Sequence, residues 1–195
     1  MLAAPMKTTP QALLKRAVGA LLLATACLGA QADLKAGEKK VQLCMLCHKP
    51  ANVGAPLLEG QPEKYLVEAI NAYRSGQRED VMQMRANVRN LSGRDVADIA
   101  AFLASRPSVA GAFTTDARKV EAGQKLVQDR HCASCHGAAF AGGGLVPRLA
   151  GQSPVYLIGQ LEAFTSGRRV HPGGGMPAGE RADFEAIAHY LASVK

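Results

Sequence analysis

The five-residue pattern Cys-x-x-Cys-His occurs twice in this chain of 195 residues, at 44–48 and at 132–136. The chain has only five cysteines, so four of them lie in these two pentads. Each pentad brings two thiols and an imidazole together on a single short stretch of backbone. Any fold of this chain therefore has to be built around two such centres.

Three chemistries can use these pentads. Two disulfides would consume the four thiols, and one zinc ion shared by both Cys-x-x-Cys units would do the same. Neither explains the histidine that follows each pair. In covalent haem attachment the two thiols form thioethers with the haem vinyl groups, and the adjacent imidazole ligates the iron. We therefore predict two covalently bound haem c groups, attached at Cys44, Cys47, Cys132 and Cys135 and ligated by His48 and His136.

The sequence around the pentads is repeated as well. Residues 36–42 (AGEKKVQ) correspond to residues 122–128 (AGQKLVQ). Gly-Gln-x-x-x-Tyr-Leu and Ser-Gly-x-Arg also occur twice, and the offset between the copies varies only from 86 to 91 positions. The chain is thus a tandem duplication. We predict a first domain at 33–106, a linker at 107–115 and a second domain at 116–195.

Each copy is predicted to form three helices, and no segment alternates as a strand would. The first helix should start at about Leu34, and in the second copy at about Asp116. The third should start at Ser92, where Asp95 completes a variant of the capping box, and in the second copy at about Ala182.

The second helix of each copy should open with proline at its first helical position, at Pro62 and Pro154. It should end near Gly76 and Gly167 in the left-handed conformation that glycine tolerates. Each copy contributes only about 80 residues to a core, and the chain has five phenylalanines, four tyrosines and no tryptophan. Such small domains are marginally stable, so a bound cofactor in each would add needed stability.

The N-terminal 32 residues have the features of a secretory signal. A basic start precedes an apolar run at 17–29, and Ala30-Gln31-Ala32 is a small-x-small cleavage pattern. The apolar run is too short to span a membrane. We expect cleavage after Ala32 and a periplasmic location; an uncleaved anchor and lipidation at Cys27 are the alternatives.

The charge of the chain argues against a nucleic-acid partner. The predicted leader carries three Lys/Arg residues and no acid, which leaves 20 basic and 16 acidic residues and a net charge of +4. The basic residues are scattered along the chain. A nucleic-acid-binding protein would concentrate them on one face, so we expect no nucleic-acid partner.

With these features in place, the mature chain resembles the cytochrome c4 family of two-domain dihaem c-type cytochromes. The resemblance rests on the two pentads, on both Gly-Gln-x-x-x-Tyr-Leu stretches and on Met84, eight residues before Ser92. It implies an all-α fold of two tandem cytochrome c domains, each with about three main helices around a covalently bound haem. It also implies that the haems lie near the interface between the domains.

The family resemblance further implies periplasmic electron transfer between respiratory redox partners. The donor would be a membrane cytochrome complex or a dehydrogenase, and the acceptor a terminal oxidase or a reductase. Peripheral association with the inner membrane is compatible with this function.

The sixth ligand of each iron decides between electron transfer and chemistry on a small molecule. Met84 lies eight residues after the glycine that should end the second helix, and Met176 lies nine residues after its counterpart. We predict these two methionines as the sixth ligands. The alternatives are Met82 in the first copy and His171 in the second.

Proline carbonyls are the expected partners of the ligand imidazoles. In c-type cytochromes the second imidazole N–H is donated to a proline carbonyl some eight to eleven residues further on. Pro56 and Pro147 match this position, and they match each other in the repeat. Of the other histidines, His131 is expected at the surface near a haem edge, and His189 is expected to be an ordinary helix residue.

If protein side chains occupy both axial positions, neither iron can bind a substrate, so the chain would carry electrons and not act as an enzyme. Two alternatives remain. The chain could be the electron-accepting subunit of a dehydrogenase complex, such as a flavocytochrome sulfide dehydrogenase. It could also be a dihaem peroxidase-type enzyme with an open position beside the loop at 171–179.

Overall fold

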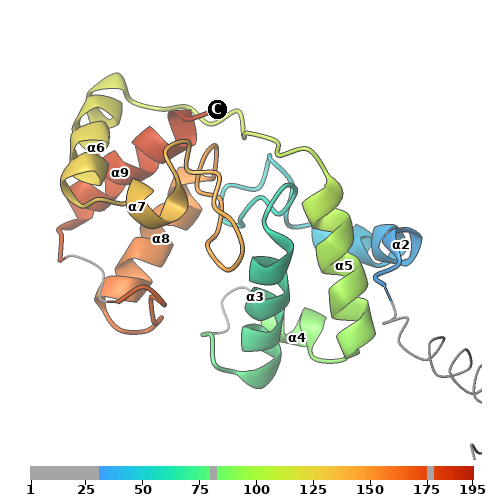
Figure 1. Cartoon of the computed structure of the whole chain (residues 1–195). Coiled ribbons are helices and arrows are strands. Elements are labelled where there is room, and N and C mark those ends of the chain that lie inside the picture. The colour runs from blue at the N-terminus through green and yellow to red at the C-terminus, as the bar shows by residue number, and fades with distance from the viewer. Residues whose placement is uncertain (1–30, 80–82, 175–177) are drawn as a thin grey trace, which may run out of the picture. The chain divides into compact units, whose positions relative to one another are not determined.

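Figure 1 shows the computed structural model of the chain, which describes residues 31–79, 83–174 and 178–195. Residues from Ala32 to Lys195 form one compact unit. The described residues are helical apart from loops and one isolated bridge between Gly143 and Val146, as the all-α prediction requires. Within these ranges no helix combines the length and the apolar character needed to cross a membrane.

Two groups of helices follow one another along the chain. We call the first group, with the loops between its helices, the first half; it contains α2 (Leu34–Met45), α3 (Glu63–Ser75), α4 (Met84–Val88) and α5 (Gly93–Ser105). The second half contains α6 (Ala117–Asp129), α7 (Ala133–His136), α8 (Pro154–Thr165) and α9 (Arg181–Ser193). The three long helices of each half were predicted from the sequence. The short α4 and α7 were not.

The helix ends follow local sequence signals. The side chain of Asp33 accepts hydrogen bonds from the backbone of the first turn of α2, and Asp116 does the same for α6. Ser92 and Asp95 form the predicted capping box at the start of α5. Gly76, with φ of 78°, ends α3 in the left-handed region.

The prediction that proline opens both second helices was right only for α8. There Ser153 is the N-cap and Pro154 is the first helical residue. In the first half, Pro62 itself occupies the cap position and α3 begins one residue later. The difference follows from the repeat: Gly60-Gln61 aligns with Gly151-Gln152, so Pro62 aligns with the N-cap Ser153 and both helices begin at the next position.

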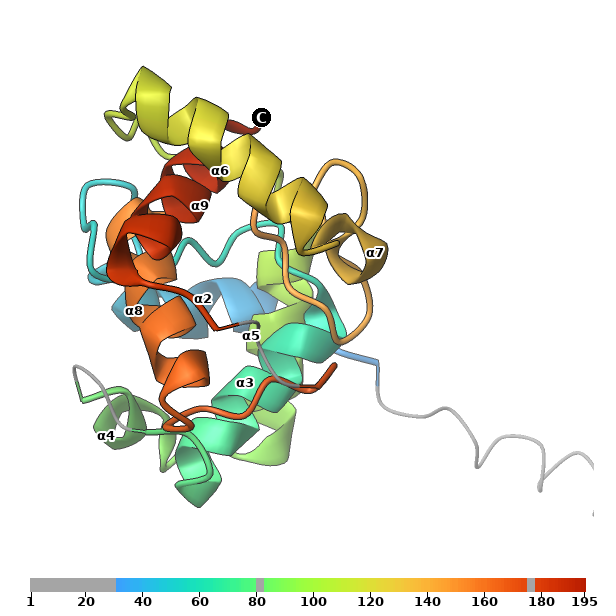
Figure 2. The ribbon, with the colours of Figure 1, turned by 90° about the vertical axis from the view of Figure 1, so that its left-hand side faces the viewer.

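Two glycines of the repeat allow the first and last helices of each half to cross closely. A Cβ atom at Gly37 in α2 would overlap the backbone carbonyl of Asp98 in α5. A Cβ atom at Gly123 in α6 would overlap the carbonyl of Ala186 in α9. The α6 and α9 helices accordingly lie against each other in both views (Figures 1 and 2).

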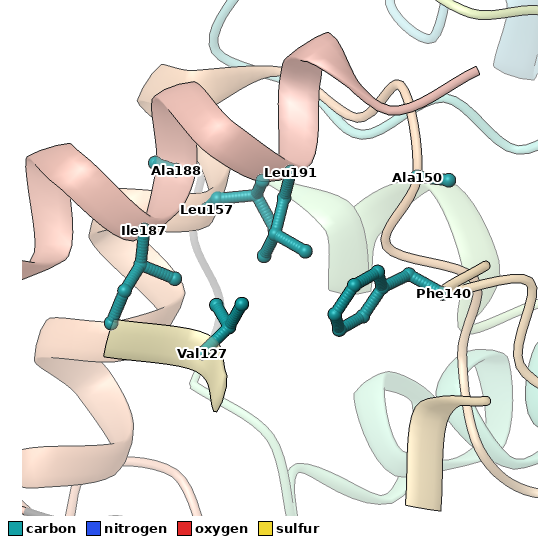
Figure 3. Packing of buried hydrophobic residues seen from close by; sticks show 7 residues of the cluster. All are labelled: Val127, Phe140, Ala150, Leu157, Ile187, Ala188 and Leu191. Carbon is teal, nitrogen blue, oxygen red and sulfur yellow. The ribbon is translucent and has the colours of Figure 1, made fainter. Parts of the chain in front are cut away.

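Each half has its own hydrophobic core. In the first half it consists of buried residues from α2, α3 and α5: Val41, Leu66, Ile99, Ala100 and Leu103. Figure 3 shows the corresponding core of the second half, formed by Val127, Phe140, Ala150, Leu157, Ile187, Ala188 and Leu191. In that view Phe140, from the loop after α7, points toward Leu191 of α9 and Val127 of α6.

The segment between the halves, residues 107–115, has no regular secondary structure. It follows the loops of both halves closely. The N–H of Gly111 donates to the carbonyl of Gly151 at 3.0 Å, and a Cβ atom at Gly60 would overlap Ser108. The connection between the halves is therefore held against their loops.

Candidate haem sites

Both pentads form a single helical turn. In the first, the N–H of His48 donates to the carbonyl of Cys44 at 3.0 Å, which continues α2 past its last residue. In the second, the N–H of His136 donates to the carbonyl of Cys132 at 3.1 Å, within the short helix α7. Each turn therefore presents two thiols and one imidazole from adjacent positions of the backbone.

The four pentad cysteines are free thiols in this structure, and none of them is joined in a disulfide. Cys47 and Cys135 are exposed, whereas Cys44 and Cys132 are half-buried, and burial raises the pKa of both half-buried thiols. Among the described residues, which include all four, no group of three or more Cys, His, Asp or Glu side chains could share a metal. The structure therefore does not bring the two Cys-x-x-Cys units together as a shared zinc site would require.

Each proximal imidazole is held by the proline carbonyl that the pattern of c-type cytochromes predicts. The Nδ1 atom of His48 lies 2.8 Å from the carbonyl oxygen of Pro56, and Nδ1 of His136 lies 3.0 Å from that of Pro147. A carbonyl can only accept, so Nδ1 carries the proton in each ring and Nε2 keeps its lone pair. Each ring therefore has its metal-binding nitrogen available.

Burial lowers the pKa of both imidazoles. For His48 the hydrogen bond to Pro56 opposes this effect, and the charge of Arg78 adds to it. For His136 the bond to Pro147 opposes it and His171 adds to it. The neutral ring is the form that binds a metal ion, so both environments favour ligation.

The predicted distal ligands are only partly described. Met84 is half-buried and is the first residue of α4, directly after Gln83 with φ of 62°. Met82 and Met176 lie outside the described residues. The alternative His171 has its ring centroid 6.5 Å from that of His136, and it packs edge-on against Phe164 at 5.1 Å.

The remaining two histidines behave as ordinary residues. His131 is exposed and precedes the second pentad with φ of 52°. His189 accepts a hydrogen bond at Nδ1 from the backbone N–H of Asp116, at 3.0 Å, and so ties α9 to the start of α6.

A buried arginine at the contact between the halves was missed by the sequence analysis. The side chain of Arg148 is 5% exposed and donates to the backbone carbonyls of Ala150 and Glu59. Its Nε atom has no hydrogen-bond partner among the described residues. Burial lowers the pKa of this guanidinium, and a negatively charged group would relieve that cost. A haem propionate is such a group, so this donor fits the predicted cofactor.

The arginines of the Ser-Gly-x-Arg repeat form a second cationic feature. The guanidinium of Arg78 lies 4.5 Å from the ring centroid of Tyr73, and that of Arg169 lies 4.6 Å from the ring of Phe164. Both arginines donate to Gln160 of α8, so Arg78 connects the first half to the second. The repeat identifies these arginines as equivalent, but it carries no sign of this contact.

Comparison with known proteins places the chain among dihaem cytochromes. A family model described as Cytochrome c matches residues 120–195. Cytochrome c4 of Azotobacter vinelandii is 31% identical over 91% of this chain and 98% of the relative. The crystal structure of reduced recombinant cytochrome c4 from Pseudomonas stutzeri superposes with a TM-score of 0.73 at 29% identity, and covers 84% of this chain and 100% of that one.

A thiosulfate dehydrogenase electron acceptor from Thiomonas intermedia (strain K12) is 28% identical over 88% of this chain and 90% of its own length. The similarity to cytochrome c4 extends through both halves, whereas the family model covers only the second. The chain belongs to the cytochrome c4 family.

Proposed function

We propose that this protein is a dihaem electron carrier that binds one haem c in each half and passes electrons between redox proteins. The observation that carries the proposal is the pair of helical turns, each presenting two free thiols beside a histidine whose Nδ1 is bound to a proline carbonyl. When bound, a haem supplies a one-electron Fe(III)/Fe(II) couple.

In each half, the cysteines, the histidine and the proline would have different roles in binding the haem. The two cysteines of each pentad would fix the haem covalently, and the Nε2 atom of the following histidine would ligate the iron. The proline carbonyl keeps each ring in one orientation and makes it a more basic ligand. The resulting assignment is Cys44, Cys47 and His48 in the first half and Cys132, Cys135 and His136 in the second.

Methionine sulfur would occupy the sixth position in both halves, from Met84 and Met176. Sulfur stabilises ferrous iron and raises the reduction potential. A filled sixth position leaves no place for a substrate, which supports a carrier and not an enzyme. In the second half His171 is the competing ligand, because its ring lies 6.5 Å from that of His136.

A dehydrogenase is one class of electron donor that a comparison supports. The similarity to a thiosulfate dehydrogenase electron acceptor favours an oxidoreductase that passes electrons to this chain. The compact arrangement of residues 32–195 would let an electron enter through one half and leave through the other. Membrane cytochrome complexes and terminal oxidases or reductases are the corresponding respiratory partners.

We also propose a periplasmic location, with a leader of residues 1–32 removed by signal peptidase. The small-x-small pattern at 30–32 supports the cleavage site. The mature chain would then consist of domains at 33–106 and 116–195 joined by the linker at 107–115. Each proposed domain contains one pentad and one hydrophobic core.

The direct test is a haem count with a visible spectrum of the exported protein in both oxidation states. We expect two haem c per chain, the methionine-to-iron charge-transfer band in the ferric state, and no carbon monoxide binding by the reduced native protein. Replacing both cysteines of one pentad with alanine should leave one haem per chain. A colourless chain, or a native protein that binds carbon monoxide, would contradict the carrier function.

A further inference from the structure

Gln61 and Gln152 occupy the same position in the repeat, and each side chain pairs with the backbone of the opposite half. The Oε1 atom of Gln152 accepts the N–H of Leu57 at 2.6 Å, and its Nε2 donates to the carbonyl of Leu57 at 3.0 Å. The Oε1 atom of Gln61 accepts the N–H of Arg148 at 2.9 Å, and its Nε2 donates to the carbonyl of Arg148 at 2.9 Å.

Both glutamines are well shielded from solvent. Gln152 is 1% exposed and Gln61 is 4% exposed. A buried amide without partners is costly, and here both polar atoms of each side chain are used. The loops before α3 and α8 meet between the two groups of helices (Figure 1), and these four hydrogen bonds join them.

The residue that each glutamine binds directly follows the proline that holds a proximal histidine. The carbonyl of Pro56 and the N–H of Leu57 belong to one peptide group. That group accepts from Nδ1 of His48 on one side and donates to Oε1 of Gln152 on the other. A continuous chain of hydrogen bonds thus runs from the ligand imidazole of the first half to a side chain of the second.

The same chain exists in the opposite direction. The peptide group of Pro147 and Arg148 accepts from Nδ1 of His136 and donates to Oε1 of Gln61. The ligand imidazole of the second half is therefore connected to a glutamine of the first half, just as His48 is connected to Gln152.

Hydrogen bonds in such a chain polarise one another. A peptide group whose N–H donates has a more negative carbonyl oxygen, and that oxygen accepts more strongly. A stronger bond at Nδ1 makes the imidazole a more basic ligand through Nε2, which favours ferric iron. The glutamine also fixes the peptide plane, and with it the direction of the bond to the ring.

We propose that Gln61 and Gln152 are positioning residues for the proximal histidine of the opposite half, so that each half sets the axial ligand of the other. The proposal rests on the ligand roles of His48 and His136 in the proposed function. It adds that the controlling residue for each haem lies in the half that does not bind it.

The test replaces one glutamine at a time and observes both haems. In Gln152→Leu the bond from His48 Nδ1 to Pro56 remains but loses the polarisation that Gln152 supplies. Exchange of the Nδ1 proton with solvent should therefore become about 1.5-fold faster, the factor for weakening an ordinary hydrogen bond by about 10–30%. The reduction potential of the first haem should rise, and the His136 proton and the second haem should stay unchanged. Gln61→Leu should give the mirror-image result.

Two further variants act as controls. Arg168→Ala removes an exposed ion pair between the halves, with Arg168 Nη1 and Glu79 Oε2 at 2.9 Å, and should change neither haem. Gln152→Met removes both hydrogen bonds at nearly the same side-chain length. It should reproduce the result of the leucine variant, and it serves as the test if the leucine variant does not fold.

The outcomes separate the inference from the function that it rests on. Suppose that the protein binds two haems. If a glutamine variant then shifts the reduction potential of the haem in its own half, of both haems equally, or of neither, the inference alone is overturned. A native protein without two histidine-ligated haems would overturn the proposed function as well.

Discussion

The backbone nitrogen of Asp33 lies 2.8 Å from Oδ1 of Asp98, a carboxylate whose side chain is 2% exposed. The same carboxylate pairs with Lys40 at 2.9 Å and with Arg94 at 3.0 Å. These contacts fasten the start of α2 to α5. The repeat places Ala186 at the corresponding position of α9, so the second half has no such carboxylate.

Substitution Asp98→Asn should therefore destabilise the protein. The amide keeps one acceptor but loses the charge that three donors now share, and hydrogen bonds to charged groups are the stronger kind. We expect the thermal unfolding midpoint, followed by circular dichroism, to fall by several degrees. Asp129→Asn, at the exposed end of α6, is the matched control and should leave the midpoint nearly unchanged. Equal midpoints for the Asp98 variant and the native protein would contradict this account.

Stability should also depend on pH through Asp98. The N–H of Asp33, followed by Lys40, lowers the pKa of this carboxyl in the folded state. Its contribution is thus fully present above the ordinary pKa of about 3.9 and is lost as pH falls through the lower folded value. The stability difference between native protein and Asp98→Asn should be constant near neutral pH and disappear in acid. Urea unfolding over a pH series measures it, and a difference that grew in acid would refute it.

Cleavage after Ala32 would change the chemistry of the contact between Asp33 and Asp98. The Asp33 nitrogen, a peptide N–H in the uncleaved chain, would become a charged ammonium beside a buried carboxylate. We expect intact mass to show a mature chain that begins at Asp33. Ala32→Leu, which blocks the small-x-small pattern, should yield an uncleaved chain with a lower unfolding midpoint. A mature N-terminus elsewhere would disprove the cleavage site.

The close crossing of α6 and α9 explains why the second copy of the repeat has glycine at position 123, as the first copy has at position 37. In Gly123→Ala the new methyl group would overlap the carbonyl of Ala186, which is backbone and cannot move aside. We expect a loss of about 3 kcal/mol in the free energy of unfolding. Gly159→Ala is the control, because nothing lies within 4 Å of its Cβ position in α8. Replacing this helical glycine with alanine should raise the free energy of unfolding by about 0.5–1 kcal/mol. Chemical denaturation compares the two, and similar effects would argue against the crossing.

The sixth ligand of the second half can be identified by paired variants. If Met176 binds the iron, Met176→Leu should remove about half of the methionine-to-iron charge-transfer absorbance, the share of one of two similar sites. His171→Leu should then leave the band unchanged. The opposite pattern, with loss of a bis-histidine spectrum in the His171 variant, would assign the ligand to His171 and lower the expected potential of that haem.

Local features of this chain were predictable because their causes are local. The capping box at Ser92 and the left-handed stop at Gly76 depend on residues within a few positions. The bonds from His48 to Pro56 and from His136 to Pro147 span only 8 and 11 residues. The pattern of c-type cytochromes, a proline eight to eleven residues after the ligand histidine, was enough to predict them.

The contacts between the halves were not predictable in the same way. Gln152 binds Leu57 across 95 positions, and Gln61 binds Arg148 across 87. The repeat marks both glutamines as equivalent, but one copy of a motif does not reveal which surface the other copy meets.

The reciprocal glutamine contact has the form of an isologous interface, in which residue i of one unit meets residue j of the other and j meets i. Two separate copies of a single-haem chain could join through this same contact about a twofold axis. Fusion of the two genes would then keep the interface and remove its concentration dependence. The linker thus makes permanent a contact that has the symmetry of a dimer, and each half receives from the other one hydrogen-bonding residue that it does not supply itself.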